Sequence, residues 1–194
     1  PFARWFIGPL DADALKATFE AVAARHTALR TRFVTEGQDR FTQWIEPTLP
    51  PDFFYVLPAS SEQEALMLAR AQLDLPMDVT RGVLRVRLIR TAPDRALMVM
   101  VIHHGSADGW SLGLLLREFV ARLNARIQGQ TLPTTSPPPQ LVDAARWERA
   151  AIEEGRYTDA VAHWRDYLAR PLLGLERTGG AMAAPHLRPV TVPS

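Results

Sequence analysis

Hydrophobic residues recur along the chain with two periods, one typical of helices and the other typical of strands. Apolar residues spaced by three and four positions predict helices over residues 12–26, 111–129, 141–153 and 157–168, and one that begins at residues 60–64. Alternating or continuous short apolar runs predict strands at residues 1–7, 29–34, 41–45, 53–57, 83–90 and 96–102. The mixture indicates an α/β layered domain with a mixed or mainly antiparallel sheet.

The last two of these strands differ in pattern. Residues 83–90 alternate, with Arg85 and Arg87 on the face opposite the leucines and valine, which predicts a strand exposed to solvent on one side. Residues 96–102 are apolar at every position, which predicts a central strand covered on both faces. Because only the turn at Pro93 separates the two, we expect them to be antiparallel neighbours.

The amino-acid composition excludes several classes of protein. The 194 residues suit one domain with a sizeable core, since 47% of them are hydrophobic. The lack of cysteine excludes a disulfide scaffold and a thiol nucleophile. A net charge of +1 argues against a dedicated nucleic-acid binder. No export signal or membrane-length apolar run is present, so a cytoplasmic protein is expected, and a single lysine, Lys16, beside 21 arginines suggests a GC-rich bacterial genome.

The chain's organisation suggests a piece of something larger. It starts and stops on strand-like runs, at residues 1–7 and 186–192, which we interpret as a fragment of a longer protein. Residues 130–140 hold four prolines and predict a stiff surface connection within the domain. Residues 170–185 are expected to form a loop.

The candidate chemistry lies where the apolar strand ends. His103 and His104 close the run, and Asp108 follows just before a predicted helix. Successive strand residues point to opposite faces, so His103 shares a face with Val101 and His104 shares the other face with Ile102. Only one imidazole can face a given cleft. One histidine is therefore a candidate base, and the other a candidate structural hydrogen-bonding residue.

Other interpretations of this segment are weaker. A histidine that ends a buried strand is often a satisfied packing residue. A metal site would need further ligands at a supporting spacing, and two side chains on opposite faces chelate one ion poorly. A hydrolase triad with Ser106 would need a Gly-x-Ser-x-Gly elbow, which is absent. No phosphate-binding loop occurs either.

Residues 103–109 resemble the His-His-x-x-x-Asp-Gly motif of nonribosomal peptide synthetase condensation domains. Three further segments resemble that family in its order, at residues 25–33, 76–85 and 163–168. The segment at residues 25–33 has the sequence Arg-His-Thr-Ala-Leu-Arg-Thr-Arg-Phe. The departures are Thr27 in place of a usual Glu, Met77 in place of Phe, and Gly105 in place of a commonly bulky apolar residue.

The resemblance implies a chloramphenicol-acetyltransferase-like fold, with residues 1–194 as the N-terminal lobe and with the start of the domain and the C-terminal lobe missing. The implied reaction joins a donor acyl thioester and an acceptor aminoacyl thioester, both on phosphopantetheine arms of carrier proteins, during synthesis of antibiotics and other secondary metabolites. No metal or directly bound cofactor is implied, and the fragment is expected to be inactive alone.

The same resemblance assigns roles to individual residues. His104 is expected to face the tunnel for the two arms, with His103 beside it. Asp108 is expected to be structural, held by a pair with Arg30. Gly109 is expected to allow a tight turn, and Trp110 to support the loop. Three alternatives remain: a CoA-dependent acyltransferase of the same superfamily, an epimerization relative, and a non-catalytic lobe that only docks carrier proteins.

Overall fold

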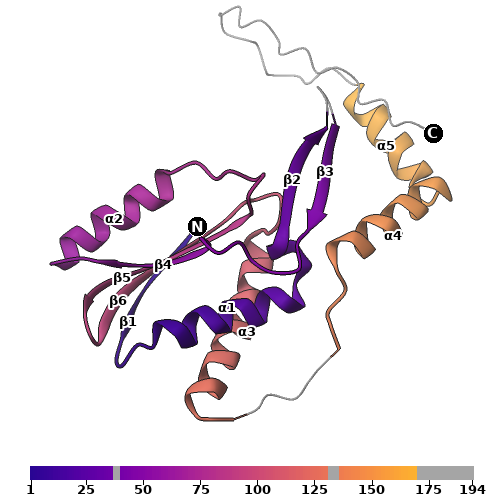
Figure 1. Cartoon of the computed structure of the whole chain (residues 1–194). Helices are drawn as coiled ribbons and strands as arrows, with labels where there is room; N and C mark the ends of the chain where they lie inside the picture. Colours follow the sequence, from indigo (N-terminus) through magenta and orange to yellow (C-terminus); the bar gives the residue numbers. More distant parts are fainter. Residues whose placement is uncertain (37–39, 131–135, 170–194) are drawn as a thin grey trace, which may run out of the picture. The chain divides into compact units, whose positions relative to one another are not determined.

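The computed structural model describes residues 1–36, 40–130 and 136–169 (Figure 1). They form six strands, five α-helices and one 3₁₀ helix, η1. The strands are β1 (Phe2–Ile7), β2 (Thr31–Glu36), β3 (Arg40–Ile45), β4 (Phe54–Pro58), β5 (Leu84–Ala92) and β6 (Arg95–Ile102). The helices are α1 (Ala12–Arg25), η1 (Thr27–Arg30), α2 (Glu62–Asp74), α3 (Gly109–Ile127), α4 (Leu141–Glu153) and α5 (Thr158–Leu168).

Four strands form one mixed sheet in the order β1-β6-β5-β4, and β2 pairs with β3 in a separate antiparallel hairpin. The β1–β6 and β5–β6 pairs are antiparallel, as expected for β5 and β6 from the short turn between them. The β4–β5 pair is parallel, and α2 supplies the crossover that a parallel connection requires. The predicted α/β class with a mixed sheet is therefore confirmed.

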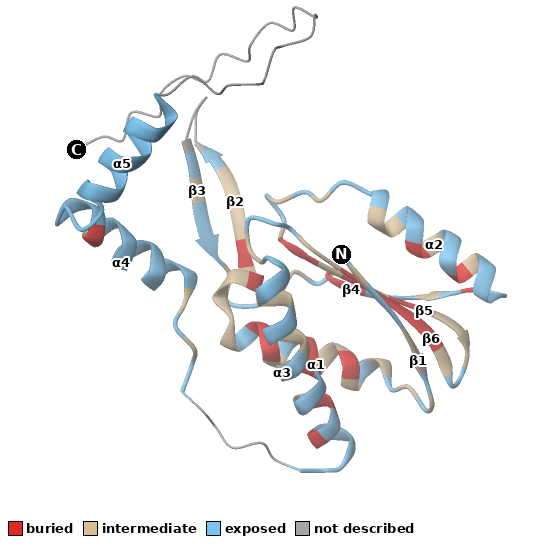
Figure 2. Cartoon of the chain, turned by 180° about the vertical axis from the view of Figure 1, so that it is seen from behind, coloured by how far each residue is buried: buried red, intermediate tan, exposed pale blue. Residues whose placement is uncertain are grey.

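Strand β6 is the centre of the core. Its residues from Ala96 to Met100 are all buried, which confirms the prediction of a strand covered on both faces. Helices α1 and α3 lie side by side on one face of the sheet, where the rings of Phe19 and Phe119 are 4.3 Å apart (Figure 1). Helix α2 covers the other face, against Ile89 and Val99. Figure 2 shows that the buried positions concentrate in the sheet and on the helix faces turned toward it.

Two details differ from the expectation. The face of β5 that carries Arg85 and Arg87 is not simply solvent-exposed, because α2 covers Ile89 on that face and both arginines are half-buried. The strand expected from Leu29 begins only at Thr31. Leu29 instead belongs to η1, where its N–H donates to the carbonyl of His26 and its side chain is buried.

The chain divides into two compact units, residues 1–145 and 146–194. In the second unit, Arg156 lies over the ring of Trp147, and the rings of Trp164 and Tyr167 meet edge to face on α5. The predicted helices at 141–153 and 157–168 match α4 and α5. The loop expected at 170–185 lies outside the described residues. None of the described helices is long and apolar enough to cross a bilayer.

The central position of the sheet predicts how core truncations act. Leu88→Ala removes a fully buried side chain from β5 and should lower the free energy of unfolding by about 2–5 kcal/mol. Leu66→Ala on α2, where the side chain is 54% exposed, should stay within about 0.5 kcal/mol. Urea unfolding followed by circular dichroism measures both. Equal effects of the two substitutions would contradict the assigned core.

Candidate active site

The end of β6 separates the two histidines. Ile102 is the last strand residue, and the His103 N–H still donates to the carbonyl of Val83 on the neighbouring chain segment. The carbonyl of His103 then accepts from the N–H of Ser106, which closes a tight turn. The alternation of the strand therefore extends into the first residues of the motif.

His104 borders a cavity of about 440 Å³ and His103 does not. The cavity is mainly apolar, with His104 and Asp108 as its polar side chains. Its lining residues are Pro1, Phe2, Met100, Ile102, His104, Ala107, Asp108, Gly109 and Leu112. His104 shares this cavity with Met100 and Ile102, as strand parity predicts. The arrangement confirms that only one of the two imidazoles faces this cavity.

His103 is held on the other side of the turn. Its Nδ1 accepts a hydrogen bond of 3.2 Å from the N–H of Gly105, and its ring lies 6.2 Å from the ring of Phe33. A neutral imidazole whose Nδ1 accepts carries its proton on Nε2. A Cβ atom at Gly105 would lie 3.2 Å from the same Nδ1. The glycine therefore leaves room for this position of His103.

Asp108 is the N-cap of α3. Its carboxylate accepts from the N–H of Ser111 at 2.8 Å and from the Ser111 hydroxyl at 2.6 Å. These two hydrogen bonds, the hydroxyl first, lower the pKa of Asp108, and the nearby His104 lowers it slightly further. The carboxylate thus satisfies an otherwise free N–H of the first helical turn and fixes where α3 begins. The Asp-Gly-Trp-Ser continuation of the motif is a capping sequence.

The expected pair between Arg30 and Asp108 is wrong. The Nε of Arg30 donates to the carbonyl of Ala23 at 2.8 Å, and its Nη1 donates to the carbonyl of Glu46. Arg30 ends η1, so its guanidinium reaches the backbone of α1 and of the segment after β3. Asp108 is satisfied within its own helix turn. Arg30 supports the fold near the hairpin and does not hold the motif loop directly.

The Arg-His segment at residues 25–26 ties α1 to α3. The Nε2 of His26 lies 2.8 Å from a carboxylate oxygen of Glu118, and Arg25 and Arg122 each lie 2.8 Å from the other oxygen. Burial raises the pKa of Glu118, but the hydrogen bonds from His26 and Arg122 outweigh it and the net direction is down. Glu118 is therefore a half-buried carboxylate shared by three basic side chains.

Thr27, where the family usually has Glu, contacts the segment before α4. Its N–H and its hydroxyl both donate to Oε1 of Gln140, at 2.9 and 2.8 Å. The Nε2 of Gln140 donates to the carbonyl of Arg25 at 3.1 Å. A glutamate at position 27 would place a carboxylate where Thr27 now donates. Thr27 thus has a physical role that a glutamate could not fill in the same way: its hydroxyl donates to Gln140.

Sequence reasoning missed Glu118 and Gln140. Glu118 belongs to the polar side of an amphipathic helix, and nothing in its sequence spacing distinguishes it from glutamates that are exposed. Trp110 lies in the first turn of α3 with 80% of its surface exposed, and its expected support role stays a prediction. Within the described ranges, no group of three or more His, Asp and Glu side chains is arranged to hold a metal ion.

Comparison with known proteins agrees with this description. The family model "Condensation domain" matches residues 4–177. Chondramide synthase cmdD of Chondromyces crocatus is 32% identical over 175 residues, which are 87% of this chain and 4% of that protein. Phosphinothricin tripeptide synthetase PhsC of Streptomyces viridochromogenes is 32% identical over 174 residues, which are 86% of this chain and 16% of that synthetase.

A solved complex of the X-domain and OxyB from teicoplanin biosynthesis also matches, with a TM-score of 0.76 and 29% identity. The match covers 86% of this chain and 37% of that one. Fold and motif geometry thus define a chloramphenicol-acetyltransferase-like domain. Within that class, the chain belongs to the condensation-domain family. It spans a small part of the synthetases that it resembles.

The cap geometry predicts how the pKa of Asp108 responds to Ser111. Ser111→Ala removes the hydroxyl donor, so the pKa of Asp108 should rise toward the ordinary value of about 3.9. Because the folded-state pKa is lowered, the carboxylate stabilises the fold above that ordinary value and loses this effect as pH falls through the folded-state pKa. A carboxyl-detected NMR titration measures the shift.

Ser106→Ala is the matched control, because the Ser106 hydroxyl is buried and has no hydrogen-bond partner in the described part of the chain. The Asp108 titration should be the same in this variant as in the unmodified protein. An unchanged Asp108 pKa in Ser111→Ala would show that the Ser111 hydroxyl is not what lowers it.

Proposed function

We propose that this chain is the N-terminal lobe of a condensation domain that forms amide bonds between carrier-bound thioesters in a nonribosomal peptide synthetase. The observation that carries the proposal is the position of His104. Its side chain borders a mainly apolar cavity, while His103 is held outside it. A histidine beside a concave apolar surface is suited to act on a substrate that enters there.

The proposed reaction is aminolysis of a thioester. The amine nitrogen of the acceptor aminoacyl group attacks the donor carbonyl carbon, and a tetrahedral intermediate forms. The carbon–sulfur bond then breaks and the carbon–nitrogen bond remains, so the donor chain moves to the acceptor arm. The departing thiolate takes up one proton, and the nitrogen loses one. The reaction needs no thiol from the chain itself, which agrees with its lack of cysteine.

His104 has three roles available within this reaction. An α-amino group has an ordinary pKa of about 8, so a substantial fraction is already neutral at physiological pH. A strong base is therefore not required before attack. The imidazole can orient the amine, accept its proton as the bond forms, and stabilise the charge of the intermediate.

The walls beside His104 suit the substrate arms. Phe2, Met100, Ile102 and Leu112 present apolar surface. Such a surface removes water from the reacting groups without offering competing hydrogen bonds. We propose that a C-terminal lobe encloses the rest of the tunnel, that each phosphopantetheine arm enters as substrate, and that the described lobe alone does not catalyse transfer.

Replacing His104 tests the catalytic assignment. In the synthetase that contains this chain, with loaded donor and acceptor carrier proteins, His104→Ala should lower the rate of peptide formation by about 10²–10⁴-fold. His163→Ala on α5 removes an imidazole outside the cavity and should leave the rate unchanged. Single-turnover mass spectrometry of the acceptor carrier measures both. An unchanged rate in His104→Ala would remove His104 from the mechanism.

Asp108→Asn tests the structural role of the motif aspartate. Asparagine is as good an N-cap as aspartate, so the variant should fold and retain most of the activity. Circular dichroism and the same carrier assay measure fold and rate. A well-folded Asp108→Asn protein that forms no peptide would show that the carboxylate charge acts in the reaction.

Two of the three alternative functions predict different results with the same proteins. A CoA-dependent acyltransferase would transfer from free acyl-CoA to a small acceptor. A docking lobe would bind carrier proteins without transfer, and the similarity to an X-domain solved with OxyB is the observation that favours testing it. Peptide formation from loaded carriers, with no transfer from acyl-CoA, supports the condensation function over both.

A further inference from the structure

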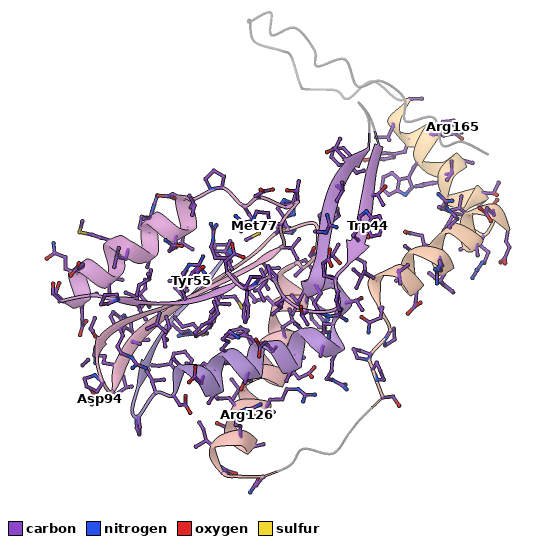
Figure 3. All side chains as sticks on the ribbon, viewed as in Figure 1. Trp44, Tyr55, Met77, Asp94, Arg126 and Arg165 are labelled. Carbon is purple, nitrogen blue, oxygen red and sulfur yellow. The ribbon has the colours of Figure 1, made fainter. Side chains whose placement is uncertain are left out.

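A second cleft, of about 240 Å³, lies at the end of the sheet where β5 begins. The segment before β4 forms one wall, the segment after α2 forms another, and β5 forms the floor. Its lining residues are Pro50, Asp52, Phe53, Leu75, Pro76, Met77, Asp78, Arg81, Gly82, Leu84, Arg85 and Arg87. Figure 3 labels Met77, which lines the cleft, and Tyr55 on β4, whose ring lies 4.8 Å from the guanidinium of Arg87.

Two of the three arginines in this cleft have no carboxylate partner among the described residues. Arg85 donates to the carbonyl of Leu75 at 2.6 Å, and Arg87 donates to that of Phe53 at 3.1 Å. The Nε of Arg85 is buried and has no hydrogen-bond acceptor in the described part of the chain. Main-chain carbonyls therefore position both guanidinium groups but leave donors unused and neutralise neither charge.

Both acidic side chains in the cleft have hydrogen-bond partners, but only Asp52 has a salt-bridge partner, since the Thr80 donors that hold Asp78 are uncharged. Asp52 lies 2.7 Å from Arg81, and Asp78 accepts from the N–H and the hydroxyl of Thr80. Burial lowers the pKa of Arg85 and of Arg87, and the charge of Arg85 lowers that of Arg87 further, partly offset by Tyr55 and Asp52. The cleft thus holds two half-buried positive charges that lie close enough to repel each other.

We propose that this cleft is a binding site for an oxyanion, a phosphate or a carboxylate group, held between the guanidinium groups of Arg85 and Arg87. An oxyanion in the cleft would accept hydrogen bonds from the accessible Nη groups of the two arginines and offset the repulsion between their charges. Planar guanidinium groups bind phosphate and carboxylate oxygens in paired hydrogen bonds. Arg81, at the cleft's more exposed side, keeps Asp52 paired and so prevents its carboxylate from repelling the ligand.

The proposed site is separate from the cavity at His104. Arg85 pairs in register with Val101, and Arg87 with Val99, so both arginines project from the sheet face that α2 covers. His104 lies with Met100 and Ile102 on the opposite face. Anion binding in the cleft therefore does not depend on the proposed amide-bond formation, and each can fail without the other.

Titration of the 194-residue chain with inorganic phosphate and, separately, with sodium acetate tests the proposal. Sodium chloride keeps the ionic strength constant during each titration. Without it, the change in screening would shift the signals of exposed charged groups even where no anion binds. The side-chain Nε–Hε NMR signals of Arg85 and Arg87 should shift in a saturable manner with at least one of the two anions. The anion that saturates at the lower concentration identifies the preferred source, phosphate or carboxylate.

Arg87→Gln should weaken this binding about tenfold or more, whereas Arg70→Gln should not change it. Arg70 is an exposed arginine on α2, paired with Asp74 outside the cleft, so its loss changes the net charge equally. Arg81→Gln, which frees the Asp52 carboxylate, is a second variant for the case that Arg87→Gln does not fold, and it should also weaken binding. Shifts that never saturate with either anion, or equal weakening in Arg70→Gln, would overturn the proposal.

Discussion

The burial of β6 on both faces is the constraint on which the rest of the structure depends. A strand without a polar face must be covered by helices on both sides, and α1 with α3 and then α2 provide that cover. Because these helices and the neighbouring strands fix the position and register of β6, its side chains alternate between the two faces up to the end of the strand. His103 and His104 follow that alternation, so the packing of the core decides which imidazole faces the cavity.

The N-cap of α3 fixes the backbone conformation between the end of β6 and the helix. A strand end alone leaves the following residues free to adopt several turns. Here the hydrogen bond from Ser106 to His103 and the two from Ser111 to Asp108 fix the turn and the first helical residue. Three short-range hydrogen bonds thus connect a buried strand to a long helix. The spacing between the second histidine and the aspartate in the motif follows from this connection.

Local patterns predicted most of the fold and part of the site. The double burial of β6, the bounds of α4 and the parity of the histidines all depend on neighbouring residues or on strand geometry, so the sequence reveals them. The contacts of Glu118 with His26 and of Gln140 with Thr27 join positions 92 and 113 residues apart. No periodicity encodes such contacts. The Arg30–Asp108 pair, expected from the family resemblance, does not form because the Arg30 guanidinium donates to the main-chain carbonyls of Ala23 and Glu46.

The two faces of the sheet separate two kinds of chemistry. On the α1–α3 face, the imidazole of His104 borders a mainly apolar cavity. On the α2 face, Arg85 occupies a position where alternation predicted solvent, yet the carbonyl of Leu75 holds it in a cleft. An anion bound in the cleft would supply the countercharge that the main-chain carbonyls do not. The alternation of the pleated strands thus places His104, proposed to act in amide-bond formation, and the proposed anion-binding arginines on opposite faces of the same sheet.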